Sequence, residues 1–341
     1  MADLAVALDG VEQASSLLFD VDPAIRSVGV GRNGDGFVYI AIRNVAAPIA
    51  YTVRLNRPPP PETINGVAVH YLNSTNDPTS LVKVPHTGPG SPGTFFLPEQ
   101  QSQRPLVCGL QLQNYDHDLR AGIIGNGAMT VGTLGCFVKL PSGLVAILSN
   151  NHVLAAENSG IQGADRIQQP GGATLNVAEV SATLTDFVPL VPSPPSASVI
   201  AGTVRFNDVD AAVATLDAGV LHQQTYLPQR PSLPPKGSAI ARVGDKVHKV
   251  GRTTGLTWGE VTQVSVQVGP VAYGIGGCWF RQSIVIEGIN GGTFSMPGDS
   301  GSAIVRDVDG MVLALLFAGN GTQTYACPIA AVLNSLALQL A

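Results

Sequence analysis

Near its C-terminus the chain reads Met296-Pro297-Gly298-Asp299-Ser300-Gly301-Ser302. A serine flanked by glycines and preceded by an aspartate is typical of a nucleophile in acyl transfer. The glycines allow a tight turn and a close approach of a carbonyl group to the backbone. In that geometry the N–H groups of Gly298 and Ser300 point at one spot, as an oxyanion hole requires. A serine hydroxyl is a weak nucleophile until a base takes its proton, so the chain must also supply a histidine and a group that orients it.

Two upstream stretches supply these groups. His152 lies in an apolar stretch, residues 148–156, and Asp210 opens a run of small and apolar residues, 211–214. The order histidine, aspartate, serine is that of the chymotrypsin arrangement, whereas subtilisin and the α/β-hydrolases use other orders. Asp208 is the rival orienting residue, but Asp210 is favoured because the run behind it matches a buried strand. Each residue alone also fits a bland interpretation, as a turn serine, a core histidine or an edge aspartate.

From about residue 101 to the end, the chain resembles a trypsin-like (chymotrypsin-fold) serine protease of the bacterial type. The features that carry the resemblance are Gly132-Thr133-Leu134-Gly135, the His152 and Asp210 stretches, Gly251-Arg252-Thr253-Thr254-Gly255 and the Ser300 stretch. The resemblance implies a mostly β fold of two six-stranded antiparallel β-barrels with a C-terminal helix. It implies a serine endopeptidase that forms an acyl-enzyme, with Ser300 as nucleophile, His152 as general base and Asp210 as its orienting carboxylate. No metal or cofactor is required.

The substrate pocket is expected from the same resemblance. Phe294 stands six residues before Ser300, where trypsins carry an acid, so nothing favours cleavage after Arg or Lys. Phe317, Ala318 and Gly319 are expected in a pocket wall, and a small or medium apolar P1 side chain is expected with them. Phe317 also stands where many members offer a serine hydroxyl to the triad aspartate, which leaves the support of Asp210 open.

Asp299 is a separate expectation of the resemblance. In animal members the matching aspartate pairs with a freshly cut N-terminus to form the oxyanion hole. Here residues 1–104 precede the barrels and no activation cleavage site is evident. We therefore expect a preformed hole, with Asp299 satisfied by another partner.

Composition narrows the class of protein. The 341 residues are 13% charged and 45% hydrophobic, with 39 Gly and 25 Pro, which favours an all-β fold with many turns. A net charge of −5 without a basic run argues against nucleic-acid binding. No signal peptide or membrane span is evident, so a cytoplasmic protein without membrane attachment is expected. The four cysteines are expected to be reduced, with a pair between barrel strands as the alternative: Cys108, Cys136, Cys278 and Cys327.

The domain organisation follows from pattern and turn signals. Residues 1–84 are predicted to form a small α+β module, 85–104 a Pro/Gly-rich linker, and 105–341 the protease domain. Barrel 1 is placed at about 105–226 and barrel 2 at about 236–341. Within these parts a helix is predicted over residues 10–25 and another over 328–341, with Val11, Ala14, Leu17 and Leu18 on one face of the first.

Other interpretations stay open. The N-terminal module is a candidate for binding a regulator, for self-association or for covering the cleft as a pro-segment. A protease fold retained for binding or scaffolding, silent or autoinhibited, is the alternative to an enzyme acting on protein or peptide substrates. Asp116-His117-Asp118 lacks a second histidine at ligand spacing and is predicted to be a loop, not a metal site. Residues 273–277 lack the lysine of a phosphate loop and are predicted to be a hairpin.

Overall fold

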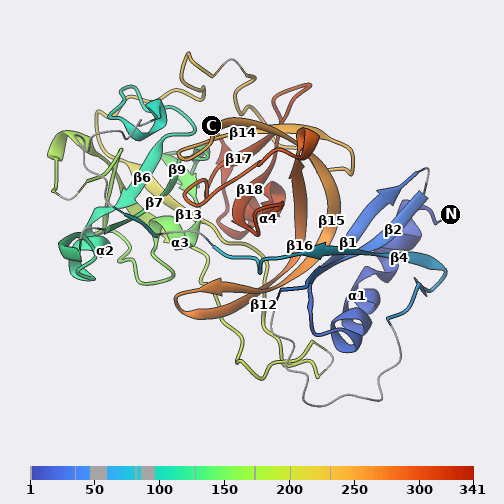
Figure 1. Ribbon diagram of the computed structural model, residues 1–341. Helices are drawn as coiled ribbons and strands as arrows, with labels where there is room; N and C mark the ends of the chain where they lie inside the picture. The colour runs from blue at the N-terminus through green and yellow to red at the C-terminus, as the bar shows by residue number, and fades with distance from the viewer. Residues whose placement is uncertain are drawn as a thin grey trace.

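The computed structural model describes residues 2–34, 36–46, 60–80, 83–85, 97–126, 128–172, 174–199, 201–230 and 232–341. Within these ranges the strands form one sheet of nine strands and one of eleven (Figure 1). The mostly β fold with a C-terminal helix, α4 (Ile329–Ser335), is confirmed. Most of the predicted linker, residues 86–96, lies outside the described residues.

The nine-stranded sheet carries the stretch around His152. Its order is β20-β8-β9-β13-β11-β10-β6-β7-β5, and the pairings along it are antiparallel. Two short helices follow strands of this sheet in the chain: α2 (Tyr115–Arg120) follows β6, and α3 (Asn151–Leu154) follows β9. The strands are β5 (Lys83–Pro85), β6 (Gln111–Asn114), β7 (Ala128–Thr133), β8 (Cys136–Lys139), β9 (Val145–Ser149), β10 (Arg166–Gln168), β11 (Val180–Phe187), β13 (Ala212–Leu216) and β20 (Gln339–Leu340).

The eleven-stranded sheet carries the stretch around Ser300. It contains a long hairpin of β15 (Gly255–Tyr273) and β16 (Gly276–Gly288), which confirms the hairpin predicted at residues 273–277. The other strands of this half are β12 (Phe206–Asn207), β14 (Lys246–Gly251), β17 (Ala303–Arg306), β18 (Val312–Gly319) and β19 (Gln323–Pro328). More than six strands join each sheet, because segments from elsewhere in the chain pair with it.

The N-terminal strands belong to this second sheet. β1 (Ile25–Asn33) pairs antiparallel with β15 on one side and with β2 (Gly36–Asn44) on the other. β4 (Val67–Ser74) continues the sheet parallel to β2, and β3 (Thr63–Ile64) ends it. In Figure 1 helix α1 (Leu4–Val21) lies against these blue strands, and together they bury a small apolar core of their own.

Helix α1 starts earlier than the predicted residues 10–25. The Asp3 side chain caps it by accepting a hydrogen bond of 2.6 Å from the Ala5 N–H. It ends at Val21 because Asp22 is extended and precedes Pro23, which disfavours helix. Val11, Ala14 and Leu18 are buried as predicted, but Leu17 is 41% exposed and lies off the buried face.

The C-terminal helix is shorter than predicted. α4 stops at Ser335. Two residues later Ala337 adopts a left-handed backbone with φ of 52°, and the chain then forms β20. β20 pairs with β8 of the first sheet, so the tail connects the two halves. A third error concerns residues 116–118, which lie in α2 and not in a loop.

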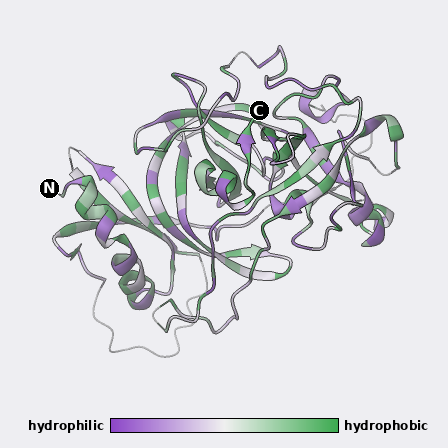
Figure 2. Ribbon diagram, turned by 180° about the vertical axis from the view of Figure 1, so that it is seen from behind, coloured by the Kyte–Doolittle hydropathy of each residue, from purple (hydrophilic) through white to green (hydrophobic). Residues whose placement is uncertain are grey.

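The main apolar core draws on both sheets. Buried side chains of β8, β9 and β13 join those of β15, β16 and β18 in one cluster. Figure 2 shows the hydrophobic residues along these strands, whereas α2 at the edge is largely hydrophilic. The stretches around His152 and Ser300 come from the two sheets that this core joins.

Candidate active site

His152 and Asp210 meet because their strands are neighbours. β9 leads into α3, which holds His152, and β13 follows Asp210; the two strands pair at Ser149 and Ala212. His152 Nδ1 and Asp210 Oδ2 are directly hydrogen-bonded, and the His152 N–H donates to Oδ1 at 3.2 Å. Both side chains are fully buried. This arrangement fixes the imidazole with Nδ1 toward the carboxylate and Nε2 away from it.

The rival aspartate lies elsewhere. Asp208 is exposed and forms an ion pair with Arg281 at 2.6 Å. Within the described residues, no hydrogen bond or ion pair joins Asp208 to His152. Of the two aspartates, Asp210 is the one in contact with His152.

Tyr273 is a further partner of Asp210 that the sequence did not suggest. It ends β15, and its hydroxyl donates to Asp210 Oδ2 at 2.8 Å. Burial, together with the neighbouring Asp210 carboxylate, raises the pKa of Tyr273 well above its usual value, so the hydroxyl stays a donor. Phe317 does not take this role; its ring packs against Phe280 with 4.4 Å between centroids. A hydroxyl from another strand replaces the serine that the resemblance led us to look for.

The tip of the hairpin that carries Tyr273 is held by Glu157. Its carboxylate accepts from the N–H groups of Gly274 at 3.0 Å and Ile275 at 2.9 Å. Residues 156–158 all have positive φ, which turns the chain after α3 back toward the hairpin. The loop after His152 and the hairpin behind Asp210 are connected through this carboxylate.

The Ser300 loop begins with a tight turn. The Asp299 N–H donates to Met296 O at 3.0 Å, with Pro297 and Gly298 between them. Gly298 has φ of +94°, and proline followed by such a glycine is the pattern of a type II turn. This is a position where a side chain would strain the backbone.

The same loop is fixed to both sheets by its backbone. The Thr133 N–H, at the end of β7, donates to Ser300 O at 2.8 Å, and the Gly301 N–H donates to Leu316 O of β18 at 2.9 Å. Gly132 fits between this loop and the histidine segment: a Cβ there would lie 2.4 Å from a Val153 methyl and 2.9 Å from Ser300 O. The histidine and serine stretches therefore approach each other across a single glycine.

Three polar groups here have no hydrogen-bond partner in the described part of the chain. His152 Nε2 is buried and has no hydrogen-bond partner among the described residues, so it is not bonded to Ser300 Oγ. The N–H groups of Gly298 and Ser300 donate to no backbone carbonyl in the described part of the chain. A buried polar atom without a partner is unfavourable unless a function or a ligand requires it.

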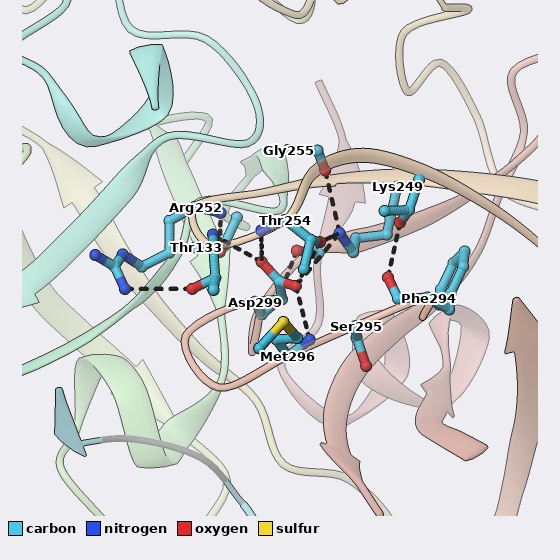
Figure 3. A network of polar contacts seen from close by, with 12 residues as sticks. Thr133, Lys249, Arg252, Thr254, Gly255, Phe294, Ser295, Met296 and Asp299 are labelled. Carbon is cyan, nitrogen blue, oxygen red and sulfur yellow. Dashed lines mark hydrogen bonds and ion pairs between the residues drawn. The ribbon is translucent and has the colours of Figure 1, made fainter. Parts of the chain in front are cut away.

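Asp299 is fully buried and has several donors (Figure 3). Its Oδ1 accepts from the Thr253 N–H at 2.9 Å and the Thr254 N–H at 3.1 Å. Its Oδ2 accepts from the Thr254 hydroxyl at 2.7 Å and lies 3.4 Å from Lys249 Nζ. The stretch 251–255 thus supports the Ser300 loop through its hydrogen bonds to Asp299.

Lys249 is the cation of this group. Its side chain is fully buried on β14, and burial lowers its pKa, although the Asp299 carboxylate opposes that effect. Gly251 leaves room for the carboxylate, because a Cβ at that position would lie 2.4 Å from Asp299 Oδ1. An internal lysine stands here, whereas the resemblance implies a cut N-terminus beside the matching aspartate of animal trypsins.

His152 lines a cleft of about 670 Å³. Its walls come from both sheets and from the segment that follows β4: Ser80, Thr130, Glu157, Tyr273, Ile275 and Pro297 are among them. The residues that line this cleft include none of the four predicted pocket residues. Phe294 and Phe317 are buried in two different core clusters, and Ala318 is buried beside Gly319 at the end of β18.

Residues 116–118 have structural partners. Asp116 forms an ion pair with Arg166, and the buried Asp118 accepts from the Thr130 N–H at 2.7 Å. The described residues contain no group of three or more His, Cys, Asp or Glu side chains that could hold a metal ion. All four cysteines are free and buried. Among the helices that the structure describes, none is long and apolar enough to cross a bilayer.

Several solved structures are similar to this chain, each at low identity and with a TM-score below 0.5. Structures similar to this one include a Nocardiopsis protease (16% identity, 69% of this chain and 97% of that one, TM-score 0.45). Another is a chymotrypsin of Cellulomonas bogoriensis (20% identity, 61% and 90%, TM-score 0.41). A third is a glutamic-acid-specific serine protease (17% identity, 69% and 100%, TM-score 0.45). No family model and no curated protein matches the sequence.

Proposed function

We propose that this chain is a serine endopeptidase that hydrolyses peptide bonds through an acyl-enzyme. One observation carries the proposal: a buried imidazole, held at Nδ1 by Asp210, has no partner for Nε2 among the described residues and lines a cleft that Pro297 of the Ser300 loop also lines. Core histidines normally have both nitrogens satisfied, so the free Nε2 favours a role in proton transfer.

In this proposal Ser300 Oγ attacks the peptide carbonyl carbon while His152 Nε2 takes its proton. The carbonyl oxygen becomes an oxyanion, which the N–H groups of Gly298 and Ser300 stabilise. The C–N bond then breaks as His152 returns the proton to the leaving amine. Water, deprotonated by the same nitrogen, hydrolyses the ester and regenerates Ser300.

Tyr273 is proposed as a positioning residue. Its hydroxyl gives Asp210 Oδ2 a second donor besides the imidazole, which keeps the carboxylate oriented toward Nδ1. The carboxylate then stabilises the imidazolium that forms during the attack. Small or medium apolar P1 side chains remain the proposed preference, with Phe294, Phe317, Ala318 and Gly319 as proposed pocket residues.

A fluorophosphonate probe tests the proposal, because it phosphonylates an activated serine Oγ with loss of fluoride. We expect labelling of the intact protein at one site, and its loss in Ser300→Ala and His152→Ala. Ser295→Ala is the matched control, since Ser295 lies in the same loop but bonds to the Thr324 hydroxyl. Labelling that survives Ser300→Ala would contradict the proposal. Complete absence of labelling would favour a silent protein or an occluded cleft.

A further inference from the structure

Residues that follow β4 contact the cleft that His152 lines. After β4, Thr79 lies beside Gly319 at the end of β18: its N–H donates to Gly319 O at 3.0 Å, and its carbonyl accepts from the Gly319 N–H at 3.2 Å. This pairing is antiparallel. On its other side the Ser80 N–H donates to Ala272 O at 3.3 Å, one residue before Tyr273. Ser80 lines the cleft together with His152.

A second contact between this part of the chain and the site is made by β5. β5 pairs antiparallel with β7, with Lys83 opposite Thr130 and Pro85 opposite Ala128. β7 is the strand whose last residue, Thr133, donates to Ser300 O. β18 is the strand whose Leu316 accepts from Gly301. β18 and β7, whose backbones bond to the Ser300 loop, are therefore the strands with which residues 79 and 83–85 pair.

This geometry matches how proteins bind extended peptides. A peptide added to a sheet edge gains main-chain hydrogen bonds that do not depend on its sequence. The pairing of Thr79 with Gly319 and that of β5 with β7 are antiparallel, whereas Thr79 and Ala272 pair in parallel. A tethered peptide also has an effective concentration on the order of millimolar, so weak pairing is enough to keep it bound.

We propose that residues 78–80 and 83–85 bind this cleft as an intramolecular peptide ligand and keep the protein autoinhibited. The inference rests on the proposed peptidase function. A substrate peptide would need the same edges of β18 and β7, so it competes with this segment. The two intervening residues, Leu81 and Val82, lie outside the described residues.

Thr79→Pro in the full chain tests the inference. Proline removes the N–H that bonds to Gly319 O and leaves the subsite strands unchanged. The control is Thr75→Pro, the same change at an exposed residue of the same segment whose N–H donates to no described backbone carbonyl. We expect Thr79→Pro to raise kcat/KM for a short peptide with leucine at P1, and the rate of fluorophosphonate labelling, at least tenfold. Thr75→Pro should behave as wild type.

A synthetic peptide of residues 76–85 provides a second arm. It should inhibit Thr79→Pro in competition with substrate and inhibit wild type much less, because the tethered segment already competes for the wild-type cleft. Unchanged rates in a folded Thr79→Pro protein would overturn the inference, even though Ser300 is labelled. If neither protein is labelled or active, the proposed function fails. Occupancy is then decided by amide hydrogen exchange in wild type, where rapid exchange of the Thr79 and Gly319 N–H groups would overturn it.

Discussion

At the scale of single residues, Asp210 is a buried carboxylate between two side-chain donors. A buried charge is unfavourable unless hydrogen bonds replace the water it has lost. Nδ1 of His152 and the hydroxyl of Tyr273 both bond to Oδ2, and the His152 N–H bonds to Oδ1. Removing one donor therefore weakens the orientation of the carboxylate without removing its charge.

Tyr273→Phe tests this donor. A hydrogen bond to a charged group contributes about 1.5–3 kcal/mol, so we expect kcat to fall about tenfold or more with KM nearly unchanged. A loss of structure alone would raise KM or lower the amount of active protein. Steady-state kinetics with active-site titration separates these effects.

Tyr226→Phe is the matched control for that variant. The Tyr226 hydroxyl is also buried but has no hydrogen-bond partner among the described residues. Its removal should leave kcat unchanged. Equal losses in both variants would contradict a positioning role for Tyr273.

The Lys249–Asp299 pair is a second residue-scale feature that can be tested. Lys249→Met leaves a buried carboxylate without its cation, and breaking a buried pair in this way typically costs about 3–5 kcal/mol. Urea unfolding followed by tryptophan fluorescence measures the loss. Because the pair supports the Ser300 loop, fluorophosphonate labelling should slow as well.

Lys246→Met is the control on the same strand, β14. Lys246 pairs with Glu260 at the surface, where its side chain is 61% exposed, and such pairs contribute about 0–1 kcal/mol. A Lys249→Met protein as stable as Lys246→Met would mean that Asp299 is satisfied by the Thr253 and Thr254 donors alone.

The chemistry-bearing residues differed in how visible they were in the sequence. Ser300 and its glycines form a local motif, because a tight turn and its free N–H groups need neighbouring residues of particular types. Tyr273 and Lys249 left no such signal. Each acts through a contact with a distant residue, Asp210 or Asp299, that exists only once the strands have paired.

At the scale of elements, Asp165 holds together the segments that surround α3. It accepts from both Nη atoms of Arg120 in α2, at 2.6 and 2.9 Å, and from Asn114 Nδ2 at the end of β6, at 3.0 Å. Asn114 in turn donates to Leu154 O, at the end of the helix that carries His152. Burial alone would raise the pKa of Asp165, but these hydrogen bonds outweigh it and hold the pKa below 3.8.

This lowered pKa predicts how stability depends on pH. The unfolded chain takes up a proton at Asp165 before the folded chain does, so the contribution is complete above about pH 5 and is lost as the pH falls through the folded-state pKa. Asp165→Asn should be about 1–3 kcal/mol less stable than wild type at pH 7, and the two stabilities should converge as the pH falls through the folded-state pKa of Asp165. Urea unfolding between pH 7 and pH 2.5 measures both curves.

Asp9→Asn, at an exposed position of α1, should keep the wild-type pH dependence. A constant difference between Asp165→Asn and wild type at all pH values would show that the lost contacts, and not the titration, cause the destabilisation.

Strands with clear apolar patterning were predictable, and elements fixed by distant partners were not. β13 lies close to the run 211–214 that matched a buried strand, because small and apolar residues mark it locally. The helix predicted over 328–341 failed at its end because apolar residues at that spacing also suit β20, and only the presence of β8 decides between them. Residues 116–118 formed α2 because Asn114 caps it by accepting from the His117 N–H.

At the scale of the whole molecule, the N-terminal module and the second sheet are continuous. β1 lies between β2 and β15, and the Phe19 ring of α1 packs edge-on against Trp279 of β16 at 5.1 Å. The division into a module over 1–84 and a protease domain over 105–341 remains a prediction. The pairing means that removing the module would leave the edge of β15 unpaired, which favours aggregation.

This continuity predicts that the module and the protease part unfold together. Gly31 lies at the contact: a Cβ there would be 2.2 Å from Ile40 Cδ1 and 2.9 Å from the backbone oxygen of Thr262 in β15. Gly31→Val must therefore displace β15 as well as β2, at a cost of about 1–3 kcal/mol. Tryptophan fluorescence and far-ultraviolet circular dichroism should still give one coincident transition, because Trp258 and Trp279 lie on the strands that β1 supports.

Gly125→Ala is the control, since a Cβ at that position meets open space. It should unfold at the wild-type urea concentration. If Gly31→Val instead gave two transitions, with the module lost first and the tryptophan signal unchanged, the module would be an independent unit. The segment after β4 would then reach the cleft as a flexible tether, and autoinhibition would be expected to weaken with the module unfolded. A single transition means that the occluding segment is anchored by the same sheet that carries Ser300.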